Sequence, residues 1–556
     1  MIKLLSINTA ISICLFSNTF FCASAQNNPT IGVTFLDSEA SSGYTLFAPE
    51  SHTSVFLINN CGGVINEWTF RDEANRSAYL LPNGNVIRAG NKFLELRNWD
   101  NVLLWAYNLE ANNFGLHHDI EPLPNGNILC IVYDYYSRAE MNSSGRNPEH
   151  TDEKFKLDKI VELKIVGSSS VEIVWEWKLF DHLVQDLYPS KKNYGIVSQS
   201  PELVNINYNL DEGFNFSHIN GIDYNEDLDQ ILFSARNLSE IYIIDHSVSS
   251  EQAATHTGGN SGMGGDIIWR WGNPQVYNRG SSQNQILIGQ HDPKWVPNGY
   301  PDQGSITVFN NRPAEIITPG DSNEVVSSSI EIVTPLMSEG TYTMNNNTFG
   351  PATPTFSWSG DILDKTMIQA KKSGVETLAN GNLLICESSI GRISEIDKEG
   401  KLYWSYTNPQ GNEIHEQYST SLVSNSIFRA QRYPLDYSAF AGKNLTSSGF
   451  LEDENTISSD CGEESREIST PTTLNNTSIS DNEILIVNPS TNGNIDLIGN
   501  LDSIEKINIS SITGQLLYST NSHFEKIELS LPHGVYLIQI QSKNAQTRTE
   551  RLIVDK

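Results

Sequence analysis

Three segments of the sequence place histidines beside short apolar runs, where an imidazole could attack an electrophile or move a proton. The first is residues 116–120, Leu-His-His-Asp-Ile, and the third is residues 289–292, Gly-Gln-His-Asp. Between them, residues 216–224 read Phe-Ser-His-Ile-Asn-Gly-Ile-Asp-Tyr and are followed at 231–237 by Ile-Leu-Phe-Ser-Ala-Arg-Asn. Because imidazole has a reference pKa of about 6.5, it is largely neutral, and therefore nucleophilic, at neutral pH.

Arg236 and Asn220 in the second segment point to chemistry on an anion. A guanidinium stays charged and can hold two oxygens of one anion in a fork, while an asparagine amide adds a neutral donor. Together with His118, His218 and His291, these groups could surround one tetrahedral anion if the fold brings the three segments together.

The candidate residues also have structural interpretations, which the sequence leaves open. The histidines of the first segment could cap a turn, and the histidine and arginine of the second could form a core cluster with Asp223. The histidine of the third segment could lie in a surface loop. Histidines outside the three segments, namely His182, His246 and His256, are interpreted as structural.

The elements that would position these residues are short β-strands. From about residue 30 to 440, apolar runs alternate with Asn-Gly, Asp-Gly and proline turns, and no long amphipathic helix is predicted. The turn Leu-Pro-Asn-Gly-Asn occurs at 81–85 and 123–127, and Leu-Ala-Asn-Gly-Asn occurs at 378–382. Asn-Gly predicts a type I′ hairpin, because both central residues tolerate positive φ.

A second repeat is a turn followed by a strand that ends in tryptophan. It occurs in about six copies, whose tryptophans are Trp68, Trp105, Trp175, Trp269, Trp358 and Trp404. This predicts an all-β fold with a six-bladed β-propeller, in which each four-stranded blade buries its faces against its neighbours. The alternative is an array of β-sandwiches, but the irregular repeat of about 40 or more residues favours the propeller. Its inner strands would converge on one central channel.

The two ends of the chain predict export. Residues 1–25 resemble a signal peptide, with Lys3, an apolar stretch and a small-residue cleavage site at 23–25, Ala-Ser-Ala. After a propeller at 30–445, the polar residues 446–480 predict a flexible linker. Strand alternation at 481–556 predicts a small Ig-like β-sandwich of about seven strands. After the signal, the sequence has no run of the about 20 apolar residues that span a membrane.

Charge and cysteine spacing exclude further partners. The net charge of -30 would repel nucleic acid, and gives no attraction to an acidic membrane surface. Cys61, Cys130, Cys386 and Cys461 lie in separate segments without a C-x-x-C pair, so a zinc ribbon is not expected. One or two disulfides could form after export, and all three complete pairings remain open. For Cys130 and Cys386, buried free thiols are an equal alternative.

The C-terminal residues resemble the type A C-terminal sorting domain of the type IX secretion system. The resemblance rests on Asn488-Pro489, Gly493, Gly514-Gln515 and residues 531–536, Leu-Pro-His-Gly-Val-Tyr. It implies that the type IX secretion machinery is a partner, and that the protein is secreted or held at the cell surface after crossing the periplasm and outer membrane. A generic carbohydrate-binding or Ig-like module is the alternative.

From about residue 40 to 440, the sequence resembles the aryl-sulfate sulfotransferase family. The resemblance includes residues 43–47, Gly-Tyr-Thr-Leu-Phe, and residues 391–397, Gly-Arg-Ile-Ser-Glu-Ile-Asp. The third segment resembles the Gln-His motif of the family, which implies that His291 is the sulfated nucleophile. The first segment resembles a further active-site histidine, for which we choose His118, with His117 as a substrate-binding candidate.

The second segment resembles the His-x-Asn motif of the family and its downstream Ser-x-Arg. This implies catalytic roles for His218 and Arg236 and a substrate-binding role for Asn220. The whole resemblance implies nucleotide-independent transfer of a sulfuryl group from an aryl sulfate to a phenolic acceptor, by a ping-pong mechanism through sulfohistidine. No cofactor and no metal ion are expected. The family includes dimers, so a homodimer is compatible with the sequence.

Missing motifs disfavour other enzyme classes. Clustered histidines can bind zinc or copper, but neither H-x-H nor H-E-x-x-H occurs. A formylglycine-type sulfatase would need C-x-P-x-R, and a nucleotide-dependent sulfotransferase would need a phosphate-binding loop that opens a helix. The alternative outside enzymes is a non-catalytic secreted propeller that binds a glycan or a protein at the cell surface.

Overall fold

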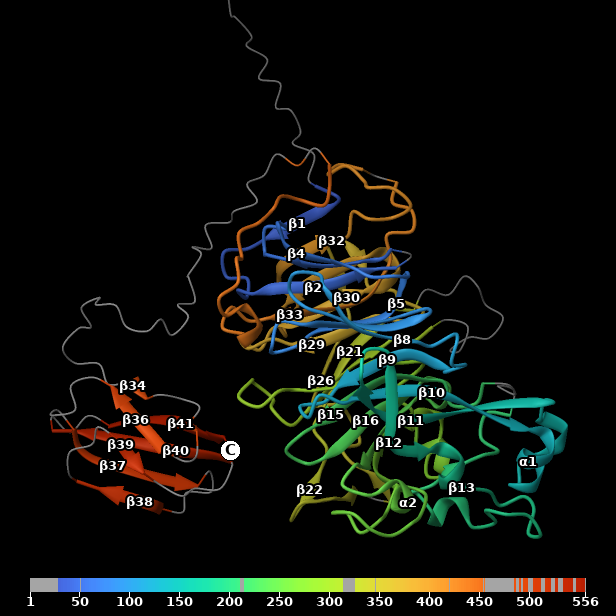
Figure 1. Cartoon of the computed structure of the whole chain (residues 1–556). Helices are drawn as coiled ribbons and strands as arrows, with labels where there is room; N and C mark the ends of the chain where they lie inside the picture. The colour runs from blue at the N-terminus through green and yellow to red at the C-terminus, as the bar shows by residue number, and fades with distance from the viewer. Residues whose placement is uncertain are drawn as a thin grey trace, which may run out of the picture. The chain divides into compact units, whose positions relative to one another are not determined.

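The computed structural model of the chain contains two compact units, Met1–Ile468 and Ser469–Lys556 (Figure 1). The predicted signal peptide and most of the predicted linker lie outside the described residues, and the signal and linker stay predictions. The described residues are 29–50, 52–210, 215–313, 326–345, 347–419, 421–453 and 455 in the first unit, and 485–486, 490–491, 494–498, 504–511, 516–521, 526–528, 534–543 and 547–555 in the second.

Six antiparallel sheets, five with four strands and one with five, dominate the described part of the first unit. Sheet 1 consists of β33 (Ile427–Tyr433), β2 (Tyr44–Pro49), β3 (Ser54–Ile58) and β4 (Val64–Thr69). Sheet 2 consists of β5 (Ala74–Leu80), β6 (Val86–Gly90), β7 (Phe93–Arg97) and β8 (Leu103–Asn108). Sheet 3 consists of β9 (Leu116–Pro122), β10 (Ile128–Ser137), β11 (Lys154–Val166) and β12 (Ser170–Lys178).

The other three sheets follow in chain order. Sheet 4 consists of β15 (Ile219–Asn225), β16 (Gln230–Ala235), β17 (Glu240–Asp245) and β18 (Ile267–Trp271). Sheet 5 consists of β19 (His291–Trp295), β20 (Ile306–Asn310), β21 (Ser329–Val333) and β26 (Phe356–Trp358). Sheet 6 consists of β29 (Gly374–Thr377), β30 (Leu383–Glu387), β31 (Arg392–Ile396) and β32 (Leu402–Thr407), with β1 (Gly32–Leu36) at its outer edge.

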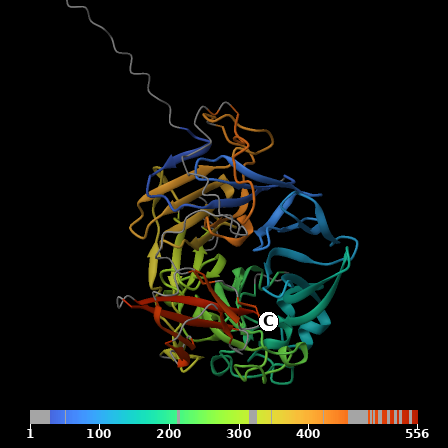
Figure 2. The same cartoon turned by 60° about the vertical axis from the view of Figure 1, so that its left-hand side comes forward.

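The first strands of the six sheets contact one another in a closed ring. The order around the ring is β33, β5, β9, β15, β19 and β29, which returns to β33. Sheet 1 joins the ends of the ring, because β33 pairs with β2 from Tyr44↔Tyr433 to Pro49↔Ile427. Figure 2 shows the sheets following one another around a centre, from blue through green to orange. The all-β, propeller-like class predicted from the sequence is therefore confirmed.

The repeated tryptophans hold neighbouring sheets together. Each lies in the fourth strand of its sheet, and five indole N–H groups donate to a backbone carbonyl of the next sheet. Trp105 Nε1 lies 3.2 Å from the carbonyl oxygen of Ser170, for example. Trp404 Nε1 lies 2.7 Å from that of Asn60 in sheet 1, which closes the ring. A buried indole that also finds a hydrogen-bond acceptor explains why tryptophan marks each repeat.

The Asn-Gly turns differ from the predicted type I′. Gly84, Gly126 and Gly381 have φ of 82°, 84° and 89°, but the asparagine before each of them is not in the positive-φ region. In the first turn, the amide of Gly84 donates to the carbonyl of Leu81 at 2.9 Å. This is a type I turn followed by a left-handed glycine. The residue before each asparagine explains the error in two of the turns, because proline at the first central position fixes φ near -65°.

Short elements fill the connections between these strands. Two short helices, α1 (Arg138–Ser143) and α2 (Ser250–Ala253), begin at serine N-caps with capping boxes. The remaining described strands are paired as β13 (Leu183–Val184) with β14 (Val204–Asn205), β22 (Met337–Ser338) with β23 (Thr341–Tyr342), β24 (Met344–Asn345) with β25 (Thr348–Phe349), and β27 (Asp361–Ile362) with β28 (Lys365–Thr366).

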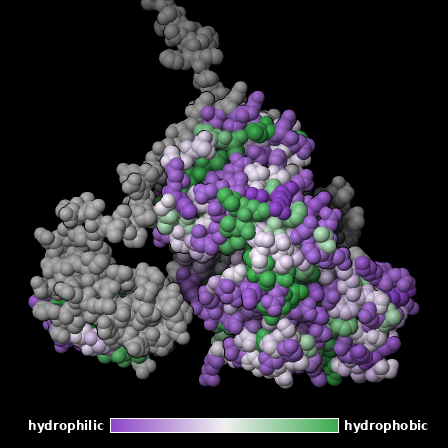
Figure 3. Space-filling model, viewed as in Figure 1, coloured by the Kyte–Doolittle hydropathy of each residue, from purple (hydrophilic) through white to green (hydrophobic). Residues whose placement is uncertain are grey.

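The described surface and cysteines of the first unit agree with an exported protein. Figure 3 shows a largely hydrophilic face, as expected for a net charge of -30. Cys61 is disulfide-bonded, and its partner lies outside the described residues. Cys130 and Cys386 are buried free thiols. At the start of the predicted linker, the amide of Ser448 donates to the carbonyl of Val64 at 2.8 Å, so this part contacts sheet 1.

The described strands of the second unit form two sheets. One has the order β34-β36-β39, and the other has the order β35-β41-β40-β37-β38. These strands overlap the alternating runs that the sequence predicts. Their bounds are β34 (Leu485–Ile486), β35 (Ser490–Thr491), β36 (Asn494–Ile498), β37 (Ile504–Ser511), β38 (Leu516–Thr520), β39 (Lys526–Glu528), β40 (Gly534–Ser542) and β41 (Thr547–Asp555).

Candidate active site

The predicted histidines meet where the ring strands begin. His117 and His118 lie near the start of β9, His218 directly precedes β15, and His291 is the first residue of β19. His118 Nε2 lies 3.2 Å from His218 Nε2, although the residues are 100 positions apart. His118 and His291 are near enough for each charge to affect the other electrostatically. Ring closure therefore brings all three histidine segments into one cluster.

Four side chains form a hydrogen-bonded path through this cluster, and the last of them contacts a carboxylate. Asn215 Nδ2 lies 2.5 Å from His218 Nδ1, and His118 Nδ1 lies 2.7 Å from His117 Nδ1. His117 Nε2 lies 3.0 Å from Asp158 Oδ1. Because an amide nitrogen only donates and a carboxylate only accepts, the path has one direction, from Asn215 through three neutral imidazoles to Asp158. The arrangement fixes the tautomer of each ring.

His291 is held separately, in the tautomer that a nucleophile needs. Its side chain is buried, with 2% of the residue exposed. His291 Nδ1 lies 2.7 Å from Asn311 Oδ1, an acceptor, so Nδ1 carries the proton. His291 Nε2 accepts a hydrogen bond from the backbone N–H of Lys372 at 3.1 Å. The lone pair therefore lies on Nε2, on the side where the loop before β29 approaches.

Burial keeps these imidazoles neutral. It lowers the pKa of His218 to about 4, with Arg236 and neighbouring groups adding to the effect. Burial likewise lowers the pKa of His118 and His291 well below the usual value, and the Arg236 charge lowers that of His291 further. Burial also lowers the pKa of His117, although its hydrogen bond to Asp158 opposes the shift. All four rings are therefore uncharged near neutral pH.

Arg236 and Asn220 take different positions in the cluster. Arg236 begins the short helix η4 (Arg236–Leu238), and its backbone N–H donates to the carbonyl of His218 at 3.1 Å. Its charge affects both His218 and His291. Asn220 is fully buried, and its Nδ2 donates to the carbonyl of Gln290 at 2.8 Å. In this state Asn220 holds the segment that carries His291, so its role in substrate binding stays a prediction.

The backbone is strained at three equivalent positions of the site. His118, His218 and Asp292 have φ of 57°, 51° and 55°, in the left-handed region that side chains rarely adopt. Each lies at or next to the start of its ring strand. Such conformations persist only where surrounding contacts impose them, and they concentrate at functional sites. One residue that the sequence does not single out contacts Asp119, Asp292 and Asn220, which lie at or near these positions.

That residue is Arg429 on β33, which ties the three histidine-bearing strands together. Its NH1 contacts the Asp119 carboxylate and lies 2.8 Å from Asp292 Oδ1, while its NH2 donates to the carbonyl of Asn220 at 3.0 Å. Only 7% of Arg429 is exposed. The signal for it in the sequence is an arginine within the apolar strand pattern at 427–433, but its partners lie hundreds of residues away.

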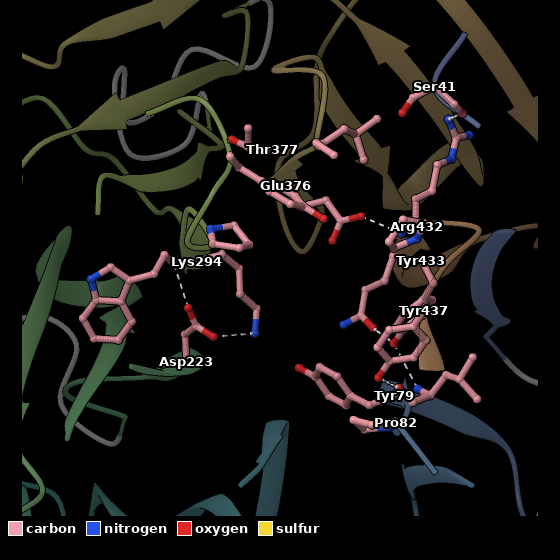
Figure 4. A pocket seen from close by; sticks show the side chains of 18 of the residues that line it. Ser41, Tyr79, Pro82, Asp223, Lys294, Glu376, Thr377, Arg432, Tyr433 and Tyr437 are labelled. Carbon is pink, nitrogen blue, oxygen red and sulfur yellow. Dashed lines mark hydrogen bonds and ion pairs between the residues drawn. The ribbon is translucent and has the colours of Figure 1, made fainter. Parts of the chain in front are cut away.

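Beyond Arg429, the ring strands end in a separate cavity of about 350 Å³. Lys294 bridges Glu121 and Asp223, at 2.9 and 3.4 Å. Figure 4 shows Lys294 and Asp223 on one wall, with Tyr433 and Tyr437 on the opposite wall. Burial raises the pKa of Glu121 and of Glu376 to about 8. The sequence analysis did not identify this cavity.

Comparison with family models identifies both parts of the chain. Residues 102–332, which contain all six predicted site residues, match the model described as arylsulfotransferase (ASST). Residues 488–555 match the secretion system C-terminal sorting domain. The chain contains an arylsulfotransferase domain and a type IX sorting domain. The sorting domain indicates export to the cell surface or secretion. None of the helices among the described residues is long and apolar enough to cross a membrane.

The solved structures that match this chain are distant in both sequence and structure. A protein of unknown function from Bacteroides caccae is 13% identical, with a TM-score of 0.36, and the match covers 70% of this chain and 99% of that one. A streptogramin B lyase is 11% identical with a TM-score of 0.32, covering 73% and 94%. The Cps50 (Swd1) β-propeller domain of Myceliophteria thermophila is 9% identical with a TM-score of 0.35, covering 74% and 97%. No curated protein matches the sequence.

Proposed function

We propose that the first unit is a sulfotransferase that moves a sulfuryl group from an aryl sulfate to a phenolic acceptor through sulfohistidine at His291. The observation that carries the proposal is the arrangement around this imidazole. Asn311 fixes the proton on Nδ1, so the lone pair lies on Nε2, where it accepts the Lys372 N–H before substrate binds, and the Arg236 charge lies within electrostatic reach. A neutral imidazole can attack an anionic ester without adding negative charge to it.

In the first half-reaction, the lone pair of His291 Nε2 forms a bond to sulfur as the bond from sulfur to the aryl oxygen breaks. Arg236 holds sulfuryl oxygens through its forked N–H groups. The backbone N–H of Lys372 loses Nε2 as its acceptor at this moment, and it is placed to donate to a sulfuryl oxygen instead. A preorganised donor of this kind stabilises the charge that develops in the transition state.

The His118–His218 pair handles the proton. The leaving aryl oxygen takes a proton from this pair, and the incoming phenol returns one before its oxygen attacks sulfur and the S–N bond breaks. Burial alone lowers the pKa of His218 to about 4, so this imidazole is largely unprotonated and a poor acid at neutral pH. A bound sulfate ester is anionic and raises the pKa of nearby imidazoles. The pair therefore takes up its proton together with the substrate.

The proposal also includes the number of propeller blades and the bounds of the domains. Six sheets in a closed ring of first strands support a six-bladed propeller over residues 30–445. Two sheets in the second unit support an Ig-like sandwich at 481–556. A signal peptide at 1–25 and a linker at 446–480 complete the export route through the type IX machinery.

Trapping the covalent intermediate tests the proposal. We expect the full chain, incubated with an aryl sulfate alone, to gain the mass of one sulfuryl group on the peptide that contains His291, and to lose it when a phenol is added. His291→Asn should abolish both steps, whereas His150→Asn, which replaces a histidine outside the cluster, should leave them intact. Wild-type protein that transfers no sulfuryl group, or a His291→Asn variant with full transfer, would refute the assignment.

A binding function without catalysis is the second candidate, and the cavity beyond Arg429 favours it. Aromatic rings and protonated carboxyl groups, which donate as well as accept hydrogen bonds, line this cavity and are the groups that bind sugars. The measurement is glycan-array binding by wild type and by Tyr437→Ala. Binding that the variant loses, in a protein without sulfuryl transfer, would support this candidate instead.

A further inference from the structure

Two histidines outside the catalytic cluster meet a carboxylate at the outer part of sheet 4. His182 ends the short helix η2 (Leu179–His182), His256 follows α2, and Asp266 directly precedes β18. His182 Nδ1 lies 2.7 Å from Asp266 Oδ1, and His256 Nδ1 lies 2.8 Å from the same oxygen. One ligand atom from each of the three residues lies within 4.8 Å of the others. The sequence analysis interpreted both histidines as structural.

The hydrogen bonds of His182 leave two acceptors facing each other. His182 Nε2 lies 2.8 Å from the carbonyl oxygen of Ala253, which can only accept, so Nε2 carries a proton. In the neutral ring, Nδ1 then has the lone pair and faces the Asp266 carboxylate, which also only accepts. Two acceptors at 2.7 Å need a proton or a metal cation between them. A histidine that ligates a metal typically donates its other N–H to a backbone carbonyl in this way.

A cation at this position would have a structural role, because it would hold the loop that begins at His256. Residues 256–265 read His-Thr-Gly-Gly-Asn-Ser-Gly-Met-Gly-Gly and form no helix or strand. Glycine loses more conformational freedom on ordering than any other residue, so this loop is costly to fix. Most of its side chains are exposed, although Met263 packs against a core cluster and Gly264 and Gly265 are buried. A bond from His256 to the buried Asp266 and His182 would tie the loop to sheet 4.

We propose that His182 Nδ1, His256 Nδ1 and the Asp266 carboxylate bind one Zn²⁺ ion that fixes this loop. Two imidazoles and a carboxylate are a donor set that zinc prefers, and a water completes a tetrahedron where three protein ligands bind. A tetrahedral ion needs its ligand atoms about 3.3 Å apart, so each N–O pair must open by about 0.6 Å. His256 can supply that movement, because 60% of its side chain is exposed.

The surroundings and the position of the site separate it from the proposed sulfotransfer site. The Glu202 carboxyl lies within electrostatic reach of both Asp266 and His256, which adds negative charge around the ion. Trp177 stacks on the His182 ring at a centroid distance of 5.3 Å and an interplanar angle of 3°, which fixes its orientation. His182 lies in the connection from sheet 3 to sheet 4, and His256 and Asp266 lie between β17 and β18, whereas the proposed sulfotransfer site lies on the ring strands. The zinc proposal therefore stands apart from the proposed function.

Metal binding by the full chain, after treatment with a chelator and dialysis, is the direct test. We expect titration with ZnCl₂ to show one bound ion, a rise in Tm, and slower cleavage of residues 256–265 by a broad-specificity protease. Co²⁺ in place of Zn²⁺ should give the visible absorption bands of a tetrahedral ion. Because none of these readouts depends on sulfuryl transfer, failure of the catalytic proposal would leave them unchanged.

His256→Gln is the decisive variant, because the exposed side chain can be replaced without disturbing the core. It should weaken zinc binding at least about 10-fold and remove the zinc-dependent changes in Tm and cleavage. The matched control His150→Gln replaces a histidine outside the cluster and should behave as wild type. Asp266→Asn should also abolish binding. Wild-type protein that binds no zinc, or a His256→Gln variant that binds it as tightly as wild type, would overturn the proposal.

Discussion

The two ends of the ring strands respond to burial in opposite ways. At their starts, burial lowers the pKa of His118, His218 and His291, so these bases are neutral. At their ends, burial raises the pKa of Glu376 to about 8, so this acid is also neutral. The same physical effect thus gives a nucleophilic, proton-accepting end and a proton-donating end. The difference comes from which residue type each end carries, and Arg429 lies between the two ends.

Arg429 lies between the two ends of the ring strands, so its removal should destabilise the protein more than the other substitutions below. Arg429→Met leaves Asp119 and Asp292 buried without their cation, and loss of one partner of a buried ion pair typically costs about 3–5 kcal/mol. We expect a large fall in the free energy of unfolding, measured with denaturant, together with loss of sulfuryl transfer. Arg138→Met, at an exposed position, should be nearly neutral. An Arg429→Met protein as stable as wild type would show that the two ends do not depend on this residue.

Substitution of Asp158, the carboxylate at the end of the imidazole path, should show whether the histidines move a proton along this path. In Asp158→Asn, the amide can present an N–H to His117, which reverses the donor order through His118 and His218. We expect kcat to fall by about 10²–10⁴-fold, the usual range for general acid–base catalysis, with a smaller change in KM. The exposed control is Asp152→Asn. Unchanged kcat in Asp158→Asn would mean that the path moves no proton.

The buried histidines at the starts of the ring strands should make the protein less stable as the pH falls. Unfolded histidine binds a proton near pH 6.5, but folded His218 does so only near pH 4, so the unfolded state binds more protons in between. We therefore expect Tm to drop from pH 6.5 to pH 4. His218→Asn should reduce this loss by about 1–2 kcal/mol, allowing for partial solvent screening. Thermal unfolding at pH 7, 5.5 and 4.5 measures it. Equal slopes for the two proteins would contradict the shift.

Glu376, at the opposite end of the ring strands, should make the protein less stable as the pH rises. We expect this change in stability to be the smallest of the four effects. Unfolded glutamate loses its proton near pH 4.5, whereas folded Glu376 keeps it until about pH 8, so stability falls as the pH rises between these values. Glu376→Gln keeps a neutral side chain and an acceptor for the Arg432 N–H. We expect a gain of about 0.5–1 kcal/mol at pH 7 and none at pH 4. A loss of stability at pH 7 would show that the Glu376 carboxylate is ionised.

The sequence predicts features that a short stretch of chain determines by itself. The tryptophans mark the fourth strand of each sheet, because that position repeats with every turn-and-strand unit. The histidine segments are recognisable because each contains its functional residue types within a few positions. The turn type was wrong because the Asn-Gly signal was weighed without the preceding proline, which selects type I at two of the three turns.

What the sequence could not predict depends on contacts across the ring. Arg429 meets Asp119, 310 residues away, only because β33 completes sheet 1. His118 contacts His218, while His117 stacks on Tyr133 and approaches Asp158, and the catalytic role of His118 stays a prediction. No periodicity or motif distinguishes two adjacent histidines in this way. The left-handed backbone at His118 appears only in the folded ring.

Sheet 1 combines strands from the two ends of the first unit, so the candidate site depends on a late segment of the chain. β33 is the last of the six ring strands along the chain, and it supplies the guanidinium that lies beneath the histidines. A nascent or partly exported chain that ends before residue 427 carries every imidazole of the site but lacks this support. The proposed sulfuryl transfer therefore needs β33 in place as well as the three histidine segments.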